Sequence, residues 1–578
     1  MPDGSSFSVP AWERLFPGRF QFELDALARA GAAVVVDPAA LAQGVLALNI
    51  DWPYAGDGLP LRAVFPGAFP FFRPLVYLMR RPFPSRHVRP NDGLICLLGR
   101  NSAQWQPNLS LAQLLEEQLA SALEGTGEED PQGEPAEMWW NSYGRAGAYG
   151  LVDSGWALGE AKAGRLRIAY RTLPAKGAEP LIQAAVLAVE DEQGRTLGEL
   201  SSPPPSGLTR RATVPWARLD QTPLPSQLEE EITGLLAESG LQRRLQTIDL
   251  GGGWAAQFGA IVYPSELQQN TLGDGWLFLA SLGRAEAFRR RTGRRGKAPS
   301  ARIEVVRTLR AGEQDLGFRI PAIAHLRAKT VGVVGLGAIG SPVVVSLARN
   351  RTHHLQLLEY DEIEPGTTVR WALGASAWGL PKLSALADLL AADYPATGVT
   401  LHAHAIGHEV VEAAADLEAL RTFVRSCQVV VDTAASYGVT VLLAYLCREA
   451  GVPLIAAYAT PNVEGGVVTV LRPRGGCPTC LEWARHDGGV PRAPGPAEGT
   501  LRQPPGCSEP TFLGADFDLQ EISLQVMRAI TAELAAPRDP AVSDVYTLSF
   551  EPSGGGAALP HWRRDELRLH AGCGCQGR

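Results

Sequence analysis

The chain has 578 residues, a formal net charge of −8 and a hydrophobic fraction of 45%. At about 100–200 residues per domain, this length predicts three or four globular domains. The acidic balance leaves no broad basic surface, so nucleic acid is excluded as the main partner.

The start of the chain lacks a basic segment followed by an apolar core, so we expect no signal peptide. The most apolar run, 331–347, contains Gly, Ser and Pro and is too short to span a bilayer comfortably, so we expect no membrane partner. The expected location is therefore the cytoplasm. In that reducing compartment, the eight cysteines favour metal binding or catalysis over disulfides.

Residues 1–125 are predicted to form the first domain, with mixed helices and strands. Apolar residues recur at helical spacing over 12–30, and a second helix is predicted at 109–123. Strand-like segments lie between these helices, at 45–52, 61–65 and 75–78. An acidic stretch rich in Gly and Pro follows, and we assign residues 126–144 to a linker.

The pattern changes in the remaining chain. Residues 145–315 contain short strand-like runs beside turn signals, with neither a repeat nor a catalytic constellation. In residues 316–578, strands alternate with helices, which is typical of a parallel sheet covered by helices. We therefore expect an α/β domain at the C-terminal end, after a middle domain of undefined type.

A glycine-rich turn lies where the first predicted strand of the C-terminal domain meets its helix. The strand covers 329–334, and the loop Gly335-Leu-Gly337-Ala-Ile-Gly340 leads into a helix at 342–349. Glycines allow a tight turn and a close backbone approach to phosphate, and the helix N-terminus offers free N–H groups. The loop alone is typical of ATP-binding and dinucleotide-binding proteins, and it also occurs in turns that bind nothing.

Charged residues behind the loop distinguish these alternatives. An acid at the end of the next strand, in Glu359-Tyr-Asp361, suits a ribose hydroxyl in a dehydrogenase as well as in an ATP-binding enzyme. Arg370 and Lys382 suit stabilisation of charge on a transferring phosphate, and Asp432, at the end of a later strand, suits Mg²⁺. Each of these three residues alone is typical of a surface ion pair. Their order after the glycine loop favours an ATP-dependent enzyme over a dehydrogenase.

This order of motifs resembles the ThiF/MoeB adenylyltransferases and the ubiquitin-activating enzymes. The resemblance implies a Rossmann-like fold, ATP and Mg²⁺ as cofactors, and attack of a C-terminal carboxylate on the α-phosphate with release of pyrophosphate. It assigns the ribose-binding acid to Glu359 and a second acid to Asp361. The asparagine of the family falls near Thr367, a departure that affects one phosphate or metal contact.

Two pairs of closely spaced cysteines lie far apart in this domain, as Cys477-Pro-Thr-Cys480 and Cys573-Gly-Cys575. Four thiolates in two such pairs can complete a tetrahedral zinc site. Since protein ligands fill every position, the predicted role is structural, and the site would attach the end of the chain to the domain. The alternative is free cysteines in glycine turns. The adenylating family also carries paired cysteines here, usually as two C-x-x-C motifs.

A further cysteine, Cys507, lies between the pairs in a loop at 485–512 that is rich in Gly, Pro and Arg. A thiol on a loop next to a site that makes acyl adenylates suits an acyl acceptor, with Arg502 nearby to favour the thiolate. The alternative is an incidental loop cysteine. Cys427 and Cys447 lie in apolar segments, which favours buried, unreactive thiols.

The N-terminal domain resembles ubiquitin-conjugating domains in two motifs. Gly93-Leu-Ile-Cys96-Leu matches their cysteine motif, and the Trp-Gln-Pro at 105–107 matches the motif before their next helix. The resemblance implies that Cys96 is the thioester cysteine. The His-Pro-Asn element of these domains is not matched, so His87 and Asn91 are the candidates for its oxyanion-stabilising role. The alternative is a degenerate, inactive domain.

Together these features predict an α/β multidomain enzyme that resembles the fused ubiquitin-conjugating and ubiquitin-activating proteins of bacterial CBASS anti-phage operons. The resemblance implies an acyl partner that is a ubiquitin-like protein or the C-terminus of a cGAS/DncV-like nucleotidyltransferase. It further implies that the middle region is an inactive copy of the adenylating fold that supports a homodimer.

The predicted reaction has three steps. The carboxylate of the partner is adenylated, Cys507 takes the acyl group as a thioester, and Cys96 receives it before a lysine of the target protein attacks. One alternative is a sulfur-carrier-activating adenylyltransferase, which needs the adenylating domain and zinc but gives no role to Cys96. Another is a non-catalytic scaffold with degenerate domains, which ATP–pyrophosphate exchange would distinguish.

Overall fold

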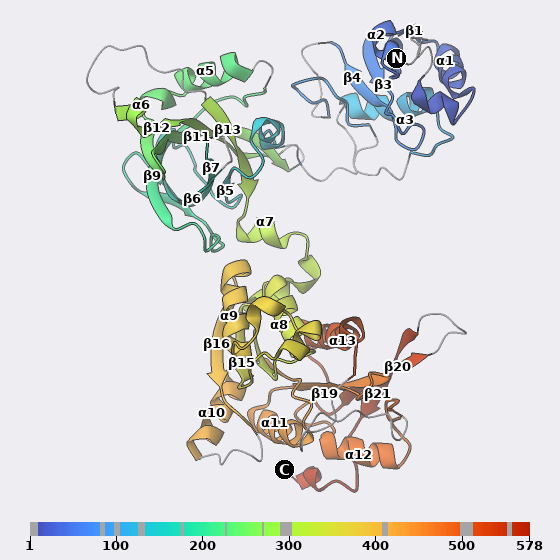
Figure 1. Ribbon diagram of the computed structural model, residues 1–578, viewed down its shortest axis with the longest axis vertical. Helices are drawn as coiled ribbons and strands as arrows, with labels where there is room; N and C mark the ends of the chain where they lie inside the picture. The colour runs from blue at the N-terminus through green and yellow to red at the C-terminus, as the bar shows by residue number, and fades with distance from the viewer. Residues whose placement is uncertain are drawn as a thin grey trace. The chain divides into compact units, whose positions relative to one another are not determined.

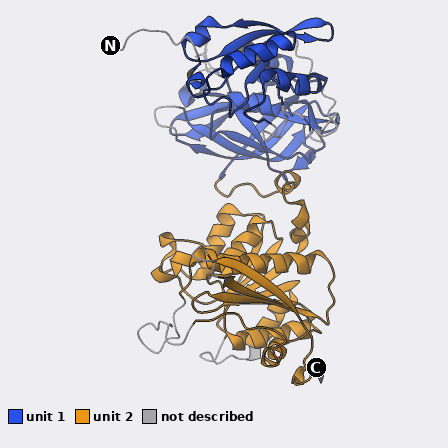
Figure 2. Ribbon diagram, turned by 90° about the vertical axis from the view of Figure 1, so that its right-hand side faces the viewer, with its two compact units in different colours: residues 1–201, 208–312 blue, residues 202–207, 313–578 orange. Residues whose placement is uncertain are grey.

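The computed structural model divides into two compact units (Figure 2). One unit comprises residues 1–201 and 208–312, and the other comprises residues 202–207 and 313–578. The structure describes residues 10–80, 87–97, 105–124, 133, 135–174, 179–225, 228–268, 271–289, 303–406, 414–496, 513–551 and 558–577. Within these ranges, no helix combines the length and the apolar character that crossing a membrane requires.

The N-terminal region contains a four-stranded antiparallel sheet between two main helices in chain order (Figure 1). Its strands are β1 (Ala33–Val36), β2 (Ala47–Tyr54), β3 (Asp57–Val64) and β4 (Leu75–Leu78), and its helices are η1 (Ala11–Arg14), α1 (Arg19–Arg29), α2 (Pro38–Ala42) and α3 (Leu111–Glu124). The predicted strands at 45–52, 61–65 and 75–78 correspond to β2, β3 and β4 within a few residues. The predicted helix at 109–123 corresponds to α3. Strand β1 was not predicted, because four residues are too few to show a clear alternation.

A buried carboxylate joins the two main helices of this region. Glu23 lies on the buried face of α1 with Ala26 and Leu27. Its carboxylate accepts a hydrogen bond from Arg19 at 2.7 Å and another from the backbone N–H of Leu111 at 2.8 Å. Glu23 therefore satisfies a free N–H group in the first turn of α3, which fixes that helix against α1.

The middle region forms a nine-stranded sheet that closes on itself. The strands run in the order β10-β11-β12-β13-β5-β7-β6-β9, β8 pairs with β7, and β9 pairs with β11 to close the barrel. They are β5 (Tyr149–Val152), β6 (Ala163–Leu173), β7 (Leu181–Asp191), β8 (Thr196–Glu199), β9 (Arg210–Arg218), β10 (Gln246–Gly251), β11 (Trp254–Gln268), β12 (Thr271–Arg284) and β13 (Ile303–Arg310). The helices are α4 (Glu137–Trp140), η3 (Asn141–Tyr143), α5 (Leu228–Glu238), η4 (Leu241–Arg243) and α6 (Ala285–Arg289). Aromatic rings fill the interior, where Phe258 stacks on Phe278 at 5.6 Å.

This barrel corrects the prediction that residues 145–315 are a copy of the adenylating fold. The adenylating fold has a parallel sheet with crossover helices, whereas most neighbouring strands described here are antiparallel, as in the long β11–β12 hairpin. Only the contacts β13–β5, β5–β7 and β9–β11 are parallel among the described pairings. The sequence indicated strands and turns, but pairing partners that lie far apart in the chain leave no local signal.

An eight-stranded sheet forms the centre of the C-terminal unit, in the order β16-β15-β14-β17-β18-β19-β20-β21. Its first five strands are parallel to one another and the last three are antiparallel to their neighbours. The strands are β14 (Thr330–Val334), β15 (His354–Glu359), β16 (Gly398–Ala403), β17 (Val429–Asp432), β18 (Leu454–Ala459), β19 (Gly465–Leu471), β20 (Ser543–Glu551) and β21 (Leu559–Leu567). The predicted alternation of strand and helix is confirmed in the parallel part.

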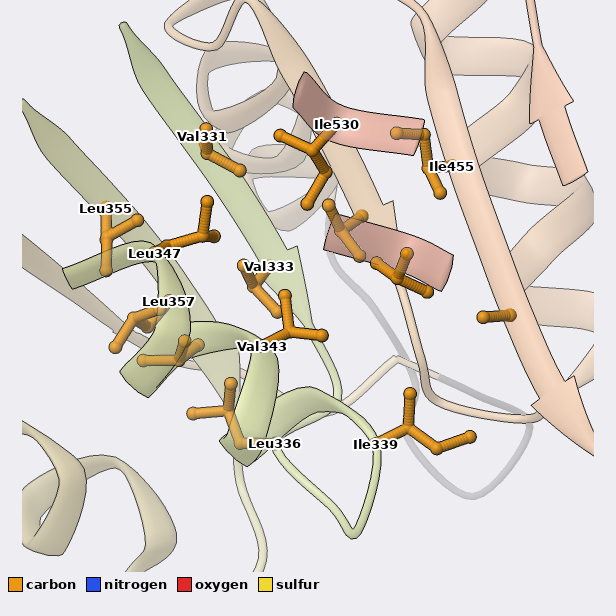
Figure 3. Close-up of a cluster of buried hydrophobic side chains, with 14 of the residues drawn as sticks. Val331, Val333, Leu336, Ile339, Val343, Leu347, Leu355, Leu357, Ile455 and Ile530 are labelled. Carbon is orange, nitrogen blue, oxygen red and sulfur yellow. The ribbon is translucent and has the colours of Figure 1, made fainter. Parts of the chain in front are cut away.

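The helices of this unit are α7 (Glu313–Gly317), η6 (Pro321–Ala328), α8 (Gly340–Arg349), η7 (Pro365–Arg370), η8 (Ala375–Ala377), α9 (Lys382–Asp393), α10 (Ala414–Arg425), α11 (Tyr437–Ala450), α12 (Pro478–His486), α13 (Asp516–Ala535) and η9 (Gly574–Gly577). Side chains of β14, β15, α8 and α13 meet in one buried cluster that includes Val331, Leu355, Val343 and Ile530 (Figure 3). This core fixes β14 between β15 and β17. In open parallel sheets, ligands bind at the carboxyl edge where neighbouring connections run in opposite directions.

Candidate active site and metal centre

The glycine loop connects β14 to α8 at that carboxyl edge. Gly335 has a φ of +80°, and a methyl group on it would lie 2.6 Å from the Ala434 nitrogen. A methyl group on Gly340 would lie 2.0 Å from the carbonyl oxygen of Gly335. By contrast, a methyl group on Gly337 would meet no described atom within 4 Å. The first and last glycines are therefore required by the fold, whereas Gly337 faces open space that a phosphate could enter.

Glu359, at the end of β15, holds the glycine loop. One carboxylate oxygen accepts a hydrogen bond from the backbone N–H of Leu336 at 2.8 Å. The other accepts from the N–H groups of Tyr360 at 2.9 Å and Asp361 at 3.1 Å. With 8% of its surface exposed, this side chain fastens the loop to β15. Its role toward a ribose hydroxyl stays a prediction.

Asp361 and Lys382, both predicted site residues, are brought together. The Lys382 ammonium group forms an ion pair with the Asp361 carboxylate, and the Lys382 backbone N–H donates to the Asp361 carbonyl oxygen at 3.0 Å. Lys382 is the first residue of α9 and its side chain is 10% exposed, whereas that of Asp361 is 56% exposed. The fold thus holds a positive charge at the end of β15.

Asp432 ends β17 directly beside the glycine loop, because it pairs in register with Val334 of β14. Its carboxylate accepts hydrogen bonds from the Thr440 hydroxyl at 2.5 Å and from the Ala434 N–H at 3.0 Å. Burial raises the pKa of this carboxyl group, which is 1% exposed. Among the ion pairs of the described residues, none includes Asp432. A cation bound at this carboxylate would offset the cost of its burial, so the residue fits the predicted role of a magnesium ligand.

Arg370 lies at the end of η7, and burial lowers the pKa of its guanidinium group. The next residue, Trp371, was missed in the sequence, although it fastens this segment to the loop. Its indole N–H donates to the carbonyl oxygen of Leu336 at 2.6 Å.

Thr440 was missed as well, since a threonine in the first turn of a helix is unremarkable until the strand before it ends in an acid.

The four predicted zinc cysteines gather in one cluster. Their sulfur atoms all lie within 4.8 Å of one another, with 3.7 Å between Cys477 and Cys480, 3.6 Å between Cys477 and Cys573, and 3.4 Å between Cys480 and Cys575. Four sulfurs bound to zinc at about 2.3 Å would stand about 3.8 Å apart, so the arrangement fits this metal. Within the described part of the chain, these cysteines are the cluster that could hold an ion.

The surroundings of the cluster also suit bound thiolates. The backbone N–H of His570 points to the Cys480 sulfur at 3.4 Å. The His570 ring stacks on Trp483 of α12 at 5.6 Å and contacts the Asp487 carboxylate at 2.8 Å. These contacts join α12 to the end of the chain around the four sulfurs. An N–H group directed at sulfur stabilises negative charge on it.

Cys96 lies on the surface of the N-terminal region, directly after two isolated β-bridges. Tyr77 of β4 pairs with Leu94, and Val88 pairs with Ile95. The backbone N–H of Cys96 donates to the carbonyl oxygen of His87 at 2.8 Å. The structure thus brings His87 and Cys96 together, and Cys96 is exposed.

The flanking motif is anchored as well. The indole N–H of Trp105 donates to the carbonyl oxygen of Pro70 at 2.8 Å, which fixes the segment before α3 to the loop before β4. Asn91 lies in the turn between His87 and Cys96. Cys507, the predicted first acceptor, and its neighbour Arg502 lie outside the described residues.

Comparison with known proteins gives a family for the whole chain. The protein y4qC of Sinorhizobium fredii is 40% identical over 566 residues, which cover 95% of this chain and 94% of that protein. The protein y4oA of the same organism is 31% identical over 597 residues, covering 98% and 97%. Each of these relatives is described as an uncharacterized protein.

Further similarities cover smaller shares of the chain. The SAMP-activating enzyme E1 of Haloferax volcanii is 30% identical over 191 residues, which cover 33% of this chain and 62% of that enzyme. The crystal structure of E. coli MccB with ATP has a TM-score of 0.32 and 15% identity, covering 44% of this chain and 68% of that one. Residues 314–514 match the ThiF family. The chain therefore belongs to the family of y4qC and y4oA, and it carries a ThiF-family adenylation domain in its C-terminal unit.

Proposed function

We propose that this chain uses ATP to adenylate the C-terminal carboxylate of a partner protein and then transfers the acyl group through thioesters to a target amine. One observation carries the proposal. In a ThiF-family domain, the glycine loop, Asp361 with its partner Lys382, and Asp432 lie at the carboxyl ends of three adjacent parallel strands, β14, β15 and β17. The similarity to an activating enzyme E1 supports this role.

In the first step, a carboxylate oxygen of the donor attacks the α-phosphorus of ATP, the bond to the bridging oxygen breaks, and pyrophosphate leaves. Lys382 and Arg370 stabilise the negative charge that shifts to the leaving group. The N-terminus of α8 adds backbone N–H groups and a partial positive charge. Bound Mg²⁺ would neutralise phosphate charge, with Asp432 as its proposed ligand.

The next steps use cysteines. The Cys507 thiolate attacks the acyl carbon and AMP leaves. The Cys96 thiolate then attacks the thioester and the Cys507 thiolate leaves. Finally a neutral lysine amine of the target attacks the acyl carbon, the Cys96 thiolate leaves with the electron pair of the broken bond, and the nitrogen gives up one proton to solvent as the amide forms. The exposed position of Cys96 supports its access to both the Cys507 thioester and a target.

The remaining parts of the proposal follow the resemblance to CBASS fusion enzymes. The acyl donor is a ubiquitin-like protein or the C-terminus of a nucleotidyltransferase, and the enzyme acts as a cytoplasmic homodimer in anti-phage defence. Zinc is the ion proposed for the four-cysteine cluster. It would hold α12 and the end of the chain together and take no part in the reaction, because protein ligands fill all four positions.

The test is ATP–pyrophosphate exchange by the full-length chain, with a ubiquitin-like protein and a cGAS/DncV-like nucleotidyltransferase as the candidate donors. Exchange that disappears in Asp432→Asn is expected, since this variant loses the charge of the proposed magnesium ligand. A thioester adduct that dithiothreitol removes is expected as well. It should be lost in Cys507→Ser, remain on Cys507 without passing to a target in Cys96→Ser, and be kept in Cys447→Ala. No exchange with either class of donor would contradict adenylation. A thiocarboxylate product that forms equally well in Cys96→Ser would favour a sulfur-carrier-activating enzyme instead.

A further inference from the structure

A pocket of about 200 Å³ opens beside the segment that follows Asp432. It lies between α11, β18 and α12, and its apolar walls include Ala456, Leu471 and Leu481. Thr440, which donates its hydroxyl hydrogen to Asp432, also lines it. Thr440 therefore lies between the pocket and Asp432, the proposed magnesium ligand.

Arg485 gives this pocket a buried positive charge. Its side chain is only 5% exposed and it lines the pocket from α12. One terminal nitrogen donates to Glu482 at 2.8 Å and the other to the Tyr458 hydroxyl oxygen at 3.0 Å. The Nε–H group is buried and has no acceptor among the described residues. Such a donor costs free energy until it finds an acceptor, so Arg485 has one hydrogen bond left to give.

The hydrogen-bond donors around Arg485 favour a ligand that carries oxygen acceptors. Glu482 also lines the pocket, and it pairs with Arg485 and, at 3.2 Å, with Arg492 outside the pocket, so two guanidinium groups share one carboxylate. The pocket lining itself holds one positive and one negative charge. In addition, Tyr458 accepts its hydrogen bond from Arg485, which leaves the hydroxyl hydrogen of Tyr458 to donate. A short carboxylate side chain between apolar walls would satisfy both donors.

We propose that this pocket binds an acidic side chain near the C-terminus of the acyl donor, an inference that rests on the proposed function. The proposed nucleotide residues and the pocket lie at different positions along the sheet. Glu359 ends β15 and the Asp361–Lys382 pair follows it, whereas the pocket lies beyond β17, against β18. A donor whose carboxylate reaches the α-phosphate near Asp432 has its preceding residues at the pocket.

The test uses the full-length chain and short fluorescent peptides of Gly and Ala with a free C-terminal carboxylate. Each peptide carries one Glu at one of its last positions, and a matched set carries Gln. Binding is measured by fluorescence anisotropy without ATP. We expect one Glu position to bind about tenfold more tightly than its Gln counterpart, the effect of one charge-assisted hydrogen-bond pair.

Variants of the chain show which residue causes the preference for Glu. Arg485→Ala is expected to remove the preference for Glu, and Arg485→Gln, which keeps a donor without the charge, is the substitute if the alanine variant does not fold. Arg492→Ala is the matched control, because Arg492 shares Glu482 but is 67% exposed and does not line the pocket, and it is expected to keep the preference.

Equal binding of the Glu and Gln sets, or a preference that survives Arg485→Gln, would overturn the pocket assignment. The two proposals fail separately. Pyrophosphate exchange without any acidic preference contradicts the pocket alone, whereas Arg485-dependent binding of Glu peptides by a chain that exchanges pyrophosphate with no donor supports the acid specificity and contradicts adenylation.

Discussion

Lys382 and Asp361 are held together twice, once by their charged side chains and once by a backbone hydrogen bond of 3.0 Å. The second contact sets where α9 begins relative to the end of β15. The ammonium group is therefore in place before any phosphate arrives. A charged side chain that is already positioned loses little conformational entropy when the transition state forms. Such preorganised charges contribute most to catalysis.

Lys382→Ala is expected to lower the rate of ATP–pyrophosphate exchange by about a hundredfold to a thousandfold, the usual loss when one preorganised donor is removed. The melting temperature should change little, because Asp361 is 56% exposed and water replaces its partner. The matched control is Lys162→Ala, which breaks the exposed ion pair with Asp220 in the barrel and should leave exchange unchanged. Equal losses in both variants would contradict the role of Lys382.

Glu359→Gln is expected to raise the KM for ATP. An amide has one acceptor oxygen in place of two, so at least one of the N–H groups of Leu336, Tyr360 and Asp361 loses its partner. The glycine loop then becomes less well fixed. Steady-state exchange kinetics measure the effect, with Glu362→Gln, an exposed neighbour, as the control. A variant with normal KM and normal kcat would show that the loop needs no such anchor.

Removal of one ligand should empty the four-cysteine site. We expect about one zinc ion per purified wild-type chain and close to none in Cys480→Ser, together with a lower melting temperature, because metal binding contributes to the free energy of unfolding. Elemental analysis and thermal unfolding measure both effects. Cys96→Ser removes an exposed thiol outside the cluster and should retain the metal. Full metal content in Cys480→Ser would rule out this ligand set.

The cysteines should differ sharply in alkylation. Burial raises the pKa of the Cys427 thiol from 9.0 to about 11, and burial raises that of Cys447 further. At about pH 8, iodoacetamide should therefore modify exposed Cys96 and leave these two unmodified until the chain unfolds. Peptide mass spectrometry after timed quenching gives the order. Modification of Cys427 or Cys447 as fast as Cys96 in the folded chain would show that their burial is transient.

The same thiols predict how stability depends on pH. Since the pKa of Cys427 is higher in the folded chain, the folded state holds more protons than the unfolded state between pH 9.0 and about 11. The free energy of unfolding is therefore unaffected by this group below about pH 9 and falls as the pH rises toward 11. Urea unfolding over this range measures the slope, which Cys427→Ala should reduce. An unchanged slope in that variant would assign the effect to other groups.

The sequence predicted the parts of the site that depend on local order. The strand, glycine loop and helix at Gly335–Gly340 are contiguous, and the two cysteine pairs carry their spacing with them. The contacts made by Trp371 and Arg485 depend instead on residues 35 and 27 positions away, so no local pattern indicates them. The closure of the barrel, where Trp216 pairs with Ala260, is non-local in the same way.

The chain segments that enter and leave the barrel contact each other. The Glu137 carboxylate of α4 pairs with Arg310 at the end of β13 at 2.5 Å, and the Asn141 side chain exchanges two hydrogen bonds with the backbone of Thr308. The segments that enter and leave the barrel are thus joined by side-chain hydrogen bonds. Chain segments whose two ends lie close together are those that tolerate circular permutation and transfer into another chain best.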